Sequence, residues 1–207
     1  MDGHMTVTYQ GRQSIYVNLT NRCPCACSFC LRKNGSGVFG SDSLWLEREP
    51  TLDEVIASLA AWDYSRFREI VFCGYGEPTE RLDVLLAAAD HMKRIDPALR
   101  IRVNTNGLSD LINGRQTASL FAGKVDSLSI SLNTDDPAEY LAMCRPKFGD
   151  AAYPALLRFA QDAVHAVPEV MLTVVGEPVT SLEQQARCRT IAERLGAHLR
   201  IRKYESS

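Results

Sequence analysis

Six short runs of mainly apolar residues recur along the chain, separated by segments with helical periodicity. Strands that alternate with helices in this way are typical of repeated βα units and a parallel sheet. Six units are fewer than the eight of a complete barrel. The pattern therefore predicts an α/β fold, a partial (β/α)6 TIM-like barrel of parallel strands that is open on one side. The runs are SIYVNLT (14–20), EIVFCG (69–74), RIRVNTNG (100–107), SLSISLN (127–133), EVMLTVVG (169–176) and LRIRKYE (199–205).

Capping signals predict where two of the intervening helices begin. Thr51 and Glu54 have the spacing of a capping box, so we expect a helix that starts after Thr51 and runs through Trp62. Thr180 and Glu183 have the same spacing and predict a second capping box. Both signals fall between predicted strands and support the βα alternation.

Several of the predicted strands carry polar residues at every second position. Successive side chains of a strand point to opposite faces, and helices cover the apolar face, so the polar set should face the barrel interior. Branched apolar residues fill a barrel interior that serves stability, whereas a polar interior predicts a polar ligand. The alternative is that these strands lie at an edge and turn their polar face to water. The polar positions are Arg100, Arg102, Asn104, Asn106, Ser127, Ser129, Ser131, Asn133, Arg200 and Arg202.

The charge balance excludes one class of function. Lys plus Arg number 23 against 25 Asp plus Glu, a formal net charge of -2, so no global positive field would hold nucleic acid without sequence preference.

No stretch approaches the roughly 20 apolar residues of a membrane span, and the N-terminus lacks the apolar core of a signal peptide. We therefore expect a cytoplasmic protein without membrane contact. Residues 1–5 are interpreted as a tag or disordered N-terminus, and residues 6–207 as one domain.

Four of the seven cysteines fall within eight consecutive positions: Cys23, Cys25, Cys27 and Cys30. This spacing indicates metal or iron–sulfur ligation in a reducing compartment better than a disulfide scaffold. Four thiolates would close a metal site, whereas three would leave one iron of a [4Fe–4S] cluster open to a ligand. A structural zinc site that uses all four is the alternative, although zinc sites usually add a second, distant pair of Cys or His.

Two motifs together resemble the radical S-adenosylmethionine (SAM) enzymes. They are the spacing Cys23-x3-Cys27-x2-Cys30 after the first strand and Gly74-Tyr75-Gly76-Glu77-Pro78 after the second. The resemblance implies that the three cysteines ligate a [4Fe–4S] cluster, that SAM binds the open iron, and that SAM is cleaved to a 5′-deoxyadenosyl radical. It also implies SAM-binding residues, with the amino group held by the glycine-rich segment. These residues are Gly74, Tyr75, Gly76, Glu77, Asn104, Asn106, Ser129, Ser131 and Asn133.

A narrower resemblance covers most of the chain, from about Ile15 to Tyr204. The segments LTNRCPCACSFC, LWLEREPT, EIVFCGYGEPTERLD, RVNTNG, SISLNT and LRIRKYE are similar to a short radical SAM family associated with TatD-type deoxyribonucleases. That family implies a non-cysteine residue where this chain has Cys25, which we expect to face away from the cluster. An external electron donor such as flavodoxin or ferredoxin is implied as a partner, and a TatD-type nuclease as an associated protein.

These observations predict a radical SAM enzyme, an oxidoreductase or transferase, whose substrate the sequence does not name. The open side of so short a barrel favours a macromolecular or nucleotide-containing substrate. Two alternatives stay open: a non-catalytic iron–sulfur or zinc-binding protein, and, within the superfamily, a small activase or nucleotide-base modifying enzyme. The candidate substrate contacts are Asn18, Arg145, Arg200 and Arg202.

Overall fold

The computed structural model describes residues 5–33, 35 and 37–204, so the first four residues of the predicted tag at residues 1–5 lie outside the described part. Within this part of the chain, seven strands form a sheet in chain order, from β1 to β7, that does not close. The first pair is antiparallel, and the pairs β2–β3, β3–β4, β5–β6 and β6–β7 are parallel, which confirms the predicted open α/β fold. The chain divides into two compact units: residues 1–23, 31–103 and 123–126, and residues 24–30, 104–122 and 127–207.

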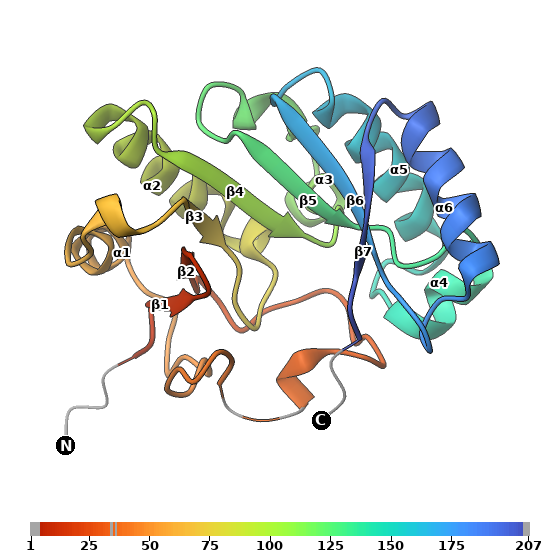
Figure 1. Ribbon diagram of the computed structural model, residues 1–207, viewed down its shortest axis with the longest axis horizontal. Helices are drawn as coiled ribbons and strands as arrows, with labels where there is room; N and C mark the ends of the chain where they lie inside the picture. Colours follow the sequence, from red (N-terminus) through yellow and green to blue (C-terminus); the bar gives the residue numbers. More distant parts are fainter. Residues whose placement is uncertain (1–4, 34, 36, 205–207) are drawn as a thin grey trace. The chain divides into compact units, whose positions relative to one another are not determined.

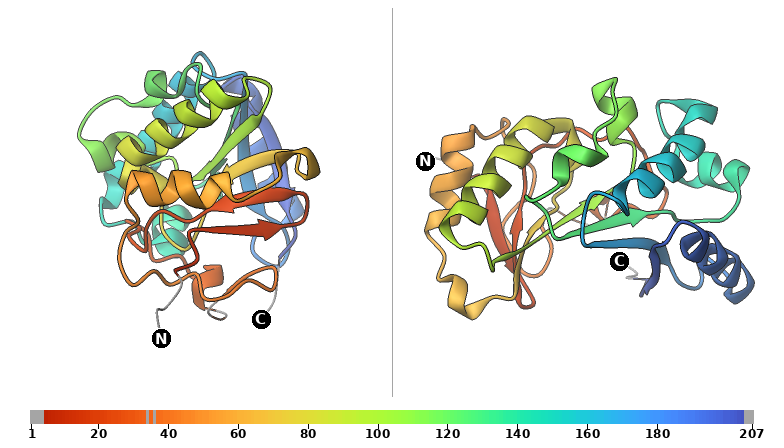
Figure 2. Two further views of the ribbon diagram at one scale, coloured as in Figure 1. Left: turned by 90° about the vertical axis from the view of Figure 1, so that its left-hand side faces the viewer. Right: turned by 90° about the horizontal axis from the view of Figure 1, so that it is seen from above.

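The first unit contains an antiparallel hairpin of β1 and β2, followed by β3 and the start of β4, which run parallel to β2. Figure 2 (left) shows the hairpin, in red, beside α1, and the hydroxyls of Thr8 and Ser58 are 2.6 Å apart there. The elements are β1 (Thr8–Gly11), β2 (Ser14–Val17), η1 (Leu31–Lys33), α1 (Leu52–Ala60), η2 (Tyr64–Arg66), β3 (Glu69–Phe72), η3 (Pro78–Arg81), α2 (Leu82–Ile95) and β4 (Arg100–Thr105).

Alternation along the strands of the first unit separates an apolar from a polar face. Ile15, Ile70 and Ile101 lie side by side in the register and are fully buried, as are Leu59 of α1 and Leu85 of α2. This apolar face forms the core with the helices, because burial of branched side chains is the main favourable term in folding. The opposite face carries the row Ser14, Glu69 and Arg100.

The second unit contains the parallel strands β5, β6 and β7 with helices α3 to α6 (Figure 1). Leu128, Ile130, Leu172 and Val174 are fully buried on its apolar face. The elements are α3 (Ser109–Asn113), η4 (Ala118–Phe121), β5 (Ser127–Ser131), α4 (Pro137–Cys144), η5 (Gly149–Ala151), α5 (Ala152–Ala163), β6 (Glu169–Val175), α6 (Leu182–Arg194) and β7 (His198–Arg202).

Three details differ from the sequence-based expectations. The six predicted strands are present, but β1 is an additional strand, because the short polar turn at Gly11–Ser14 joins it to β2 as a hairpin. The helix at Thr51 has its predicted capping box but ends at Ala60, before Trp62.

The second capping box uses other residues than predicted. Ser181 caps α6 and Gln184 completes the box, one residue beyond Thr180 and Glu183. The Thr180 hydroxyl instead donates to the carbonyl of Val175, which leaves the following serine as the helix cap. Local spacing alone does not distinguish two overlapping capping patterns.

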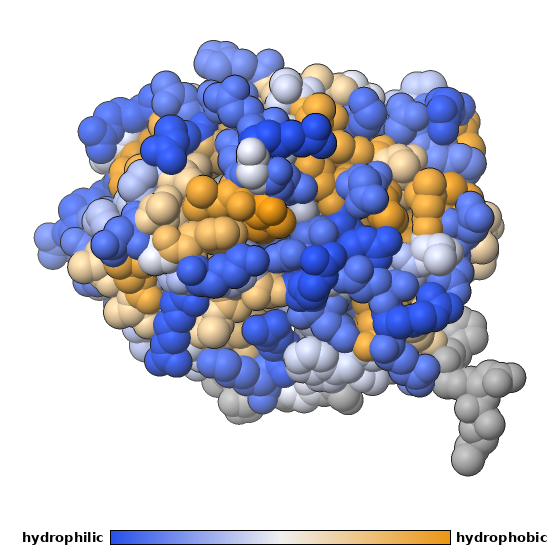
Figure 3. Space-filling view, turned by 180° about the vertical axis from the view of Figure 1, so that it is seen from behind, coloured by the Kyte–Doolittle hydropathy of each residue, from blue (hydrophilic) through white to orange (hydrophobic). Residues whose placement is uncertain are grey.

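None of the helices in the described part of the chain combines the length and the apolar character that a membrane crossing requires. On the face seen in Figure 3, hydrophilic side chains (blue) are interspersed with hydrophobic ones (orange).

Candidate functional site

The residues directly before Cys23 are held by a network of polar side chains in the first unit. Thr20 Oγ1 donates to Glu49 Oε1 (2.6 Å), and Arg22 Nε donates to the same oxygen (2.6 Å). Arg22 Nη1 also donates to Glu80 Oε2 (3.1 Å), and Arg81 Nη1 to Glu49 Oε2 (3.1 Å). One carboxylate thus connects the loop after β2 with η3, and its partners fix the backbone that leads into Cys23.

A second set of contacts fixes the loop after β2 from its other side. Asn21 Nδ2 donates to Leu46 O (2.7 Å), and Leu46 N donates back to Asn21 Oδ1 (3.1 Å). Asn18 is fully buried, and its Nδ2 donates to Leu44 O (2.8 Å) and Thr6 O (3.3 Å). The side-chain amide of Asn18, a predicted substrate contact, therefore donates to two backbone carbonyls. A substrate role for Asn18 stays a prediction.

The glycine-rich segment after β3 lies against this same loop. Glu77 N donates to Arg22 O (2.8 Å), which places Glu77 next to the residue that precedes Cys23. A Cβ on Gly76 would lie 2.2 Å from Thr20 O and 2.6 Å from Arg22 O, so only glycine fits there without a shift of backbone. The glycine segment and the backbone that leads into Cys23, more than 50 residues apart in sequence, thus pack against each other within the first unit.

Gly74 and Tyr75 of that segment have structural partners as well. A Cβ on Gly74 would lie 2.0 Å from Asn18 Oδ1, a buried oxygen that has no hydrogen-bond partner among the described residues. Tyr75 is buried, donates its hydroxyl proton to Gly35 O (2.8 Å) and packs edge-on against Trp45. Glu77 Oε1 accepts hydrogen bonds from Thr79 N (3.2 Å) and Thr79 Oγ1 (2.8 Å), as the cap of η3.

We expect the Glu49 network to make folding stability depend on pH. Burial raises the pKa of Glu49, but hydrogen bonds from Arg22 and Thr20 and the charge of Arg81 lower it more, so the net shift is downward. A carboxyl whose folded pKa is depressed stabilises the fold above its unfolded pKa, and this contribution is lost as the pH falls through the folded value. Glu49→Gln should therefore reduce the free energy of unfolding by about 1 kcal/mol near pH 7.

Urea titrations between pH 7 and pH 3 would measure that difference, which should shrink toward the acid end. Glu47→Gln is the matched control, because Glu47 is exposed and two residues away. Equal stability loss in both variants, or a Glu49→Gln deficit that is constant with pH, would contradict the assignment.

In the second unit, the segment that carries Cys25, Cys27 and Cys30 pairs with the end of α4. Ala26 N donates to Cys144 O (3.0 Å) and Ser28 N to Met143 O (2.9 Å), while Lys147 N donates to Pro24 O (2.8 Å). Cys25 and Pro146 form an antiparallel bridge. The residues after α4 thus act as a docking strand for the cysteine segment, a role that periodicity could not indicate.

The cysteines of the segment differ in burial. Cys25 is buried, and Asn106 Nδ2 lies 3.9 Å from its sulfur, at a distance of a weak N–H···S contact. Cys23, Cys27 and Cys30 are only partly buried, and a backbone hydrogen bond from Cys30 N to Cys27 O (3.4 Å) places these two on one turn. Cys25 is therefore the buried member of the group, and the assignment of the other three as cluster ligands stays a prediction.

The predicted polar face of the second unit is present. Arg200 Nη2 of β7 donates to Ser129 Oγ of β5 (2.9 Å), and Ser131, Thr173 and Arg200 occupy one row across the register. Asn133 is buried in a left-handed conformation (φ 67°), and its Nδ2 donates to Cys144 Sγ (3.2 Å).

The remaining predicted site residues of the second unit are only partly buried or exposed. Asn106 Oδ1 accepts from Leu108 N (2.9 Å), and Asn104, Ser131 and Arg202 are partly buried. Arg145 is exposed and caps α4 in a left-handed conformation (φ 46°), directly beside the docking strand. A contact of any of these with SAM or substrate stays a prediction.

All seven cysteines are present as thiols. Across residues 5–33, 35 and 37–204, no three His, Cys, Asp or Glu side chains converge into a ready-made metal site, so the set of three ligands stays a prediction. The donor chemistry nevertheless fits a cluster, since soft thiolates from a short loop are the usual iron–sulfur ligands. Gly76 has a different part in the site, because its missing side chain lets the carbonyls of Thr20 and Arg22 pack against the glycine segment.

Several residues that build the site were not singled out by the sequence. They lie in loops and act through contacts with residues far away in the chain, which neither motif spacing nor periodicity reveals. The residues are Asn21, Arg22, Leu46, Glu49, Glu80, Met143 and Lys147.

Comparison with known proteins gives a family match over most of the chain. A family model described as the Radical SAM superfamily matches residues 17–194. GTP 3',8-cyclase from Limosilactobacillus fermentum is 28% identical over 131 residues, which are 63% of this chain and 36% of that protein. Dual-specificity RNA methyltransferase RlmN from Sulfurimonas denitrificans is 29% identical over 123 residues, 55% of this chain and 32% of that protein. The chain thus spans about a third of the length of these curated relatives.

Solved structures share the fold. A radical SAM methyltransferase from Sphaerobacter thermophilus superposes with a TM-score of 0.63 at 19% identity and covers 94% of this chain and 56% of that chain. The structure of anSMEcpe with bound AdoMet has a TM-score of 0.59 at 14% identity and covers 92% of this chain and 51% of that chain. At such identities the likeness concerns the fold alone.

Proposed function

Because the chain belongs to the radical SAM superfamily, we propose that it is an enzyme that reductively cleaves SAM and abstracts hydrogen from a nucleotide-containing or macromolecular substrate. Proteins of this superfamily bind a [4Fe–4S] cluster and SAM. When bound, the cluster supplies the electron that breaks a C–S bond of SAM. The chain's own residues must hold both groups and keep the loop around them rigid.

The observation that carries the proposal is the contact, within the first unit, between the glycine segment and the backbone that leads into Cys23. The hydrogen bond from Glu77 N to Arg22 O brings the glycine segment to the backbone that enters the cysteine loop. A carboxylate at this position suits the ammonium group of SAM, and the absence of a side chain at Gly76 lets the backbone before Cys23 pack against the segment. Gly74, Gly76 and Glu77 are therefore our candidates for the SAM amino group, and Cys23, Cys27 and Cys30 for the cluster.

The polar row of the second unit supports a place for the rest of the cofactor or the substrate. Arg200 beside Ser129 presents a guanidinium on the same face as Ser131. A guanidinium group has several donors in a fixed plane, which suits the carboxylate or phosphate oxygens of a ligand. We propose that Asn104, Asn106 and Asn133 join this row as polar contacts to SAM.

The substrate class rests on the relatives. The curated matches act on a nucleotide, as GTP 3',8-cyclase, and on RNA, as dual-specificity RNA methyltransferase. We extend only the common feature, a nucleotide moiety, to this chain. We further propose one domain over residues 6–207, a cytoplasmic location, an external electron donor such as flavodoxin or ferredoxin, and the association with a TatD-type nuclease.

Anaerobic reconstitution with iron and sulfide, followed by reduction with dithionite in the presence of SAM, tests the function. We expect about four iron atoms per chain, as the cluster formula requires, and release of 5′-deoxyadenosine and methionine. Liquid chromatography with mass spectrometry measures both products. A fully loaded cluster that cleaves no SAM would instead support a non-catalytic iron–sulfur protein, and stoichiometric zinc without iron would support a structural metal site.

A further inference from the structure

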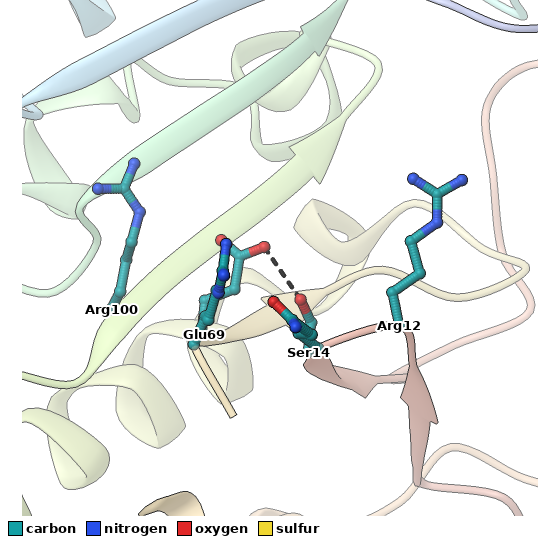
Figure 4. Close-up of a pocket in the computed structure, with 6 residues that line it drawn as sticks. Arg12, Ser14, Glu69 and Arg100 are labelled. Atoms are coloured by element: carbon teal, nitrogen blue, oxygen red, sulfur yellow. Dashed lines mark hydrogen bonds between the residues drawn. The ribbon is translucent and has the colours of Figure 1, made fainter. Parts of the chain in front are cut away.

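A cavity of about 620 Å³ lies in the first unit, lined by residues that precede or begin its strands. β2, β3 and β4 run parallel and start at this edge of the sheet, whereas the glycine segment Gly74–Glu77 follows the end of β3. The cavity is thus at the opposite end of the strands from the proposed SAM site. Its lining residues, drawn in Figure 4, are Arg12, Gln13, Ser14, Arg68, Glu69 and Arg100.

Three arginines reach this cavity from three backbone segments that are fixed to one another. Arg12 stands in the hairpin turn between β1 and β2 in a left-handed conformation (φ 54°). Arg68 N donates to Gln13 O (2.9 Å), which ties the start of β3 to that turn. Arg100 is in register with Glu69 at the start of β4. In Figure 4, Arg12 and Arg100 flank Glu69 and extend their guanidinium groups to the same side.

The only carboxylate among these lining residues is engaged by a residue outside the cavity. Glu69 accepts two hydrogen bonds from Arg102, from Nε (3.1 Å) and Nη2 (2.8 Å), and a third from Ser14 Oγ (3.1 Å). Burial raises the pKa of Glu69, but the hydrogen bonds and charge of Arg102, the hydrogen bond from Ser14 and the charge of Arg100 lower it more, so the carboxyl is ionised at neutral pH. Three arginines against one glutamate leave a net positive lining, and Arg102 adds further positive charge.

We propose that this cavity binds the diphosphate group of a small ligand, such as a nucleoside diphosphate. Guanidinium groups present forked donors that match phosphate oxygens, and several of them fixed around one space suit a ligand with more than one negative charge. Small-molecule sites commonly measure about 300 to 1,000 Å³, a range that includes this cavity. The site is separate from the proposed SAM site and adds a second, anion-binding function to the first unit.

Isothermal titration calorimetry on the full chain at low salt, with inorganic pyrophosphate and ADP as probes, tests the proposal. We expect both to bind, and each of Arg12→Gln, Arg68→Gln and Arg100→Gln to weaken the affinity about tenfold, the effect of one charge-assisted hydrogen bond. Arg66→Gln is the matched control, an exposed arginine near the cavity that does not line it, and its affinity should equal that of the wild type.

A second measurement distinguishes a lost site from a lost fold. The three target arginines are exposed, so the triple variant should keep the wild-type circular dichroism spectrum and melting temperature without ligand. ADP should raise the melting temperature of the wild type and of Arg66→Gln but not of the triple variant. Equal binding of ADP by the wild type and the triple variant would overturn the proposal. A single-stranded oligonucleotide that binds where pyrophosphate does not would also overturn it, in favour of a polynucleotide surface.

Discussion

Replacing Cys27 by alanine is expected to abolish both cluster assembly and SAM cleavage. The proposed cluster has three protein ligands, so the loss of one leaves two irons without a thiolate and no stable site for SAM. Iron content should fall from about four per chain to near zero, and 5′-deoxyadenosine should no longer be released. Cys23→Ala and Cys30→Ala should behave in the same way. Iron analysis, the visible absorption of the reconstituted protein and product chromatography measure the effect.

Cys25→Ala is the matched control within the same loop. Its sulfur is buried beside Asn106 and Pro146, so its removal should cost packing while the other three cysteines still bind iron. We expect a loss of about 1 kcal/mol in the free energy of unfolding, with cluster and cleavage retained. If Cys25→Ala lost iron as completely as Cys27→Ala, four thiols would be ligands and the open-iron assignment would be wrong.

Gly76→Ala should have the second largest effect. Its new Cβ would lie 2.2 Å from Thr20 O and 2.6 Å from Arg22 O, and both are backbone atoms that cannot rotate away. The glycine segment and the loop before Cys23 must then separate, which should break the hydrogen bond from Glu77 N to Arg22 O. We expect a destabilisation of about 3 kcal/mol, measured by denaturant titration, and a large drop in iron loading.

Gly176→Ala controls for the general effect of replacing glycine. There the nearest atom to a Cβ is Ile201 Cγ2 at 3.1 Å, part of an exposed side chain that can turn aside. The cost should stay below about 1 kcal/mol, with unchanged iron content. A Gly76→Ala protein as stable and as iron-loaded as this control would show that cluster loading does not depend on the close packing of the glycine segment against the backbone before Cys23.

Much of the fold can be predicted from the sequence, because the spacing of apolar residues along a short segment indicates whether that segment forms a strand or a helix. Alternation identified the six parallel strands and predicted that Ser129 and Arg200 share a face, which their hydrogen bond confirms. The hairpin strand β1 was missed, since its sequence TYQG carries little apolar content. The second capping box was misplaced by one residue, because Thr180 and Ser181 both fit the pattern and a contact to Val175 decides between them.

By itself, the sequence determined the open α/β fold, the family and the set of motif residues, because these depend on residue type and spacing. Only the tertiary structure decided which residues support the motifs. Glu49 joins Thr20, Arg22 and Arg81, and the end of α4 docks the cysteine segment, through contacts between loops with no repeating pattern. The arginine cavity likewise exists only because parallel strands begin at one edge of a sheet, which brings Arg12, Arg68 and Arg100 together from distant places in the chain.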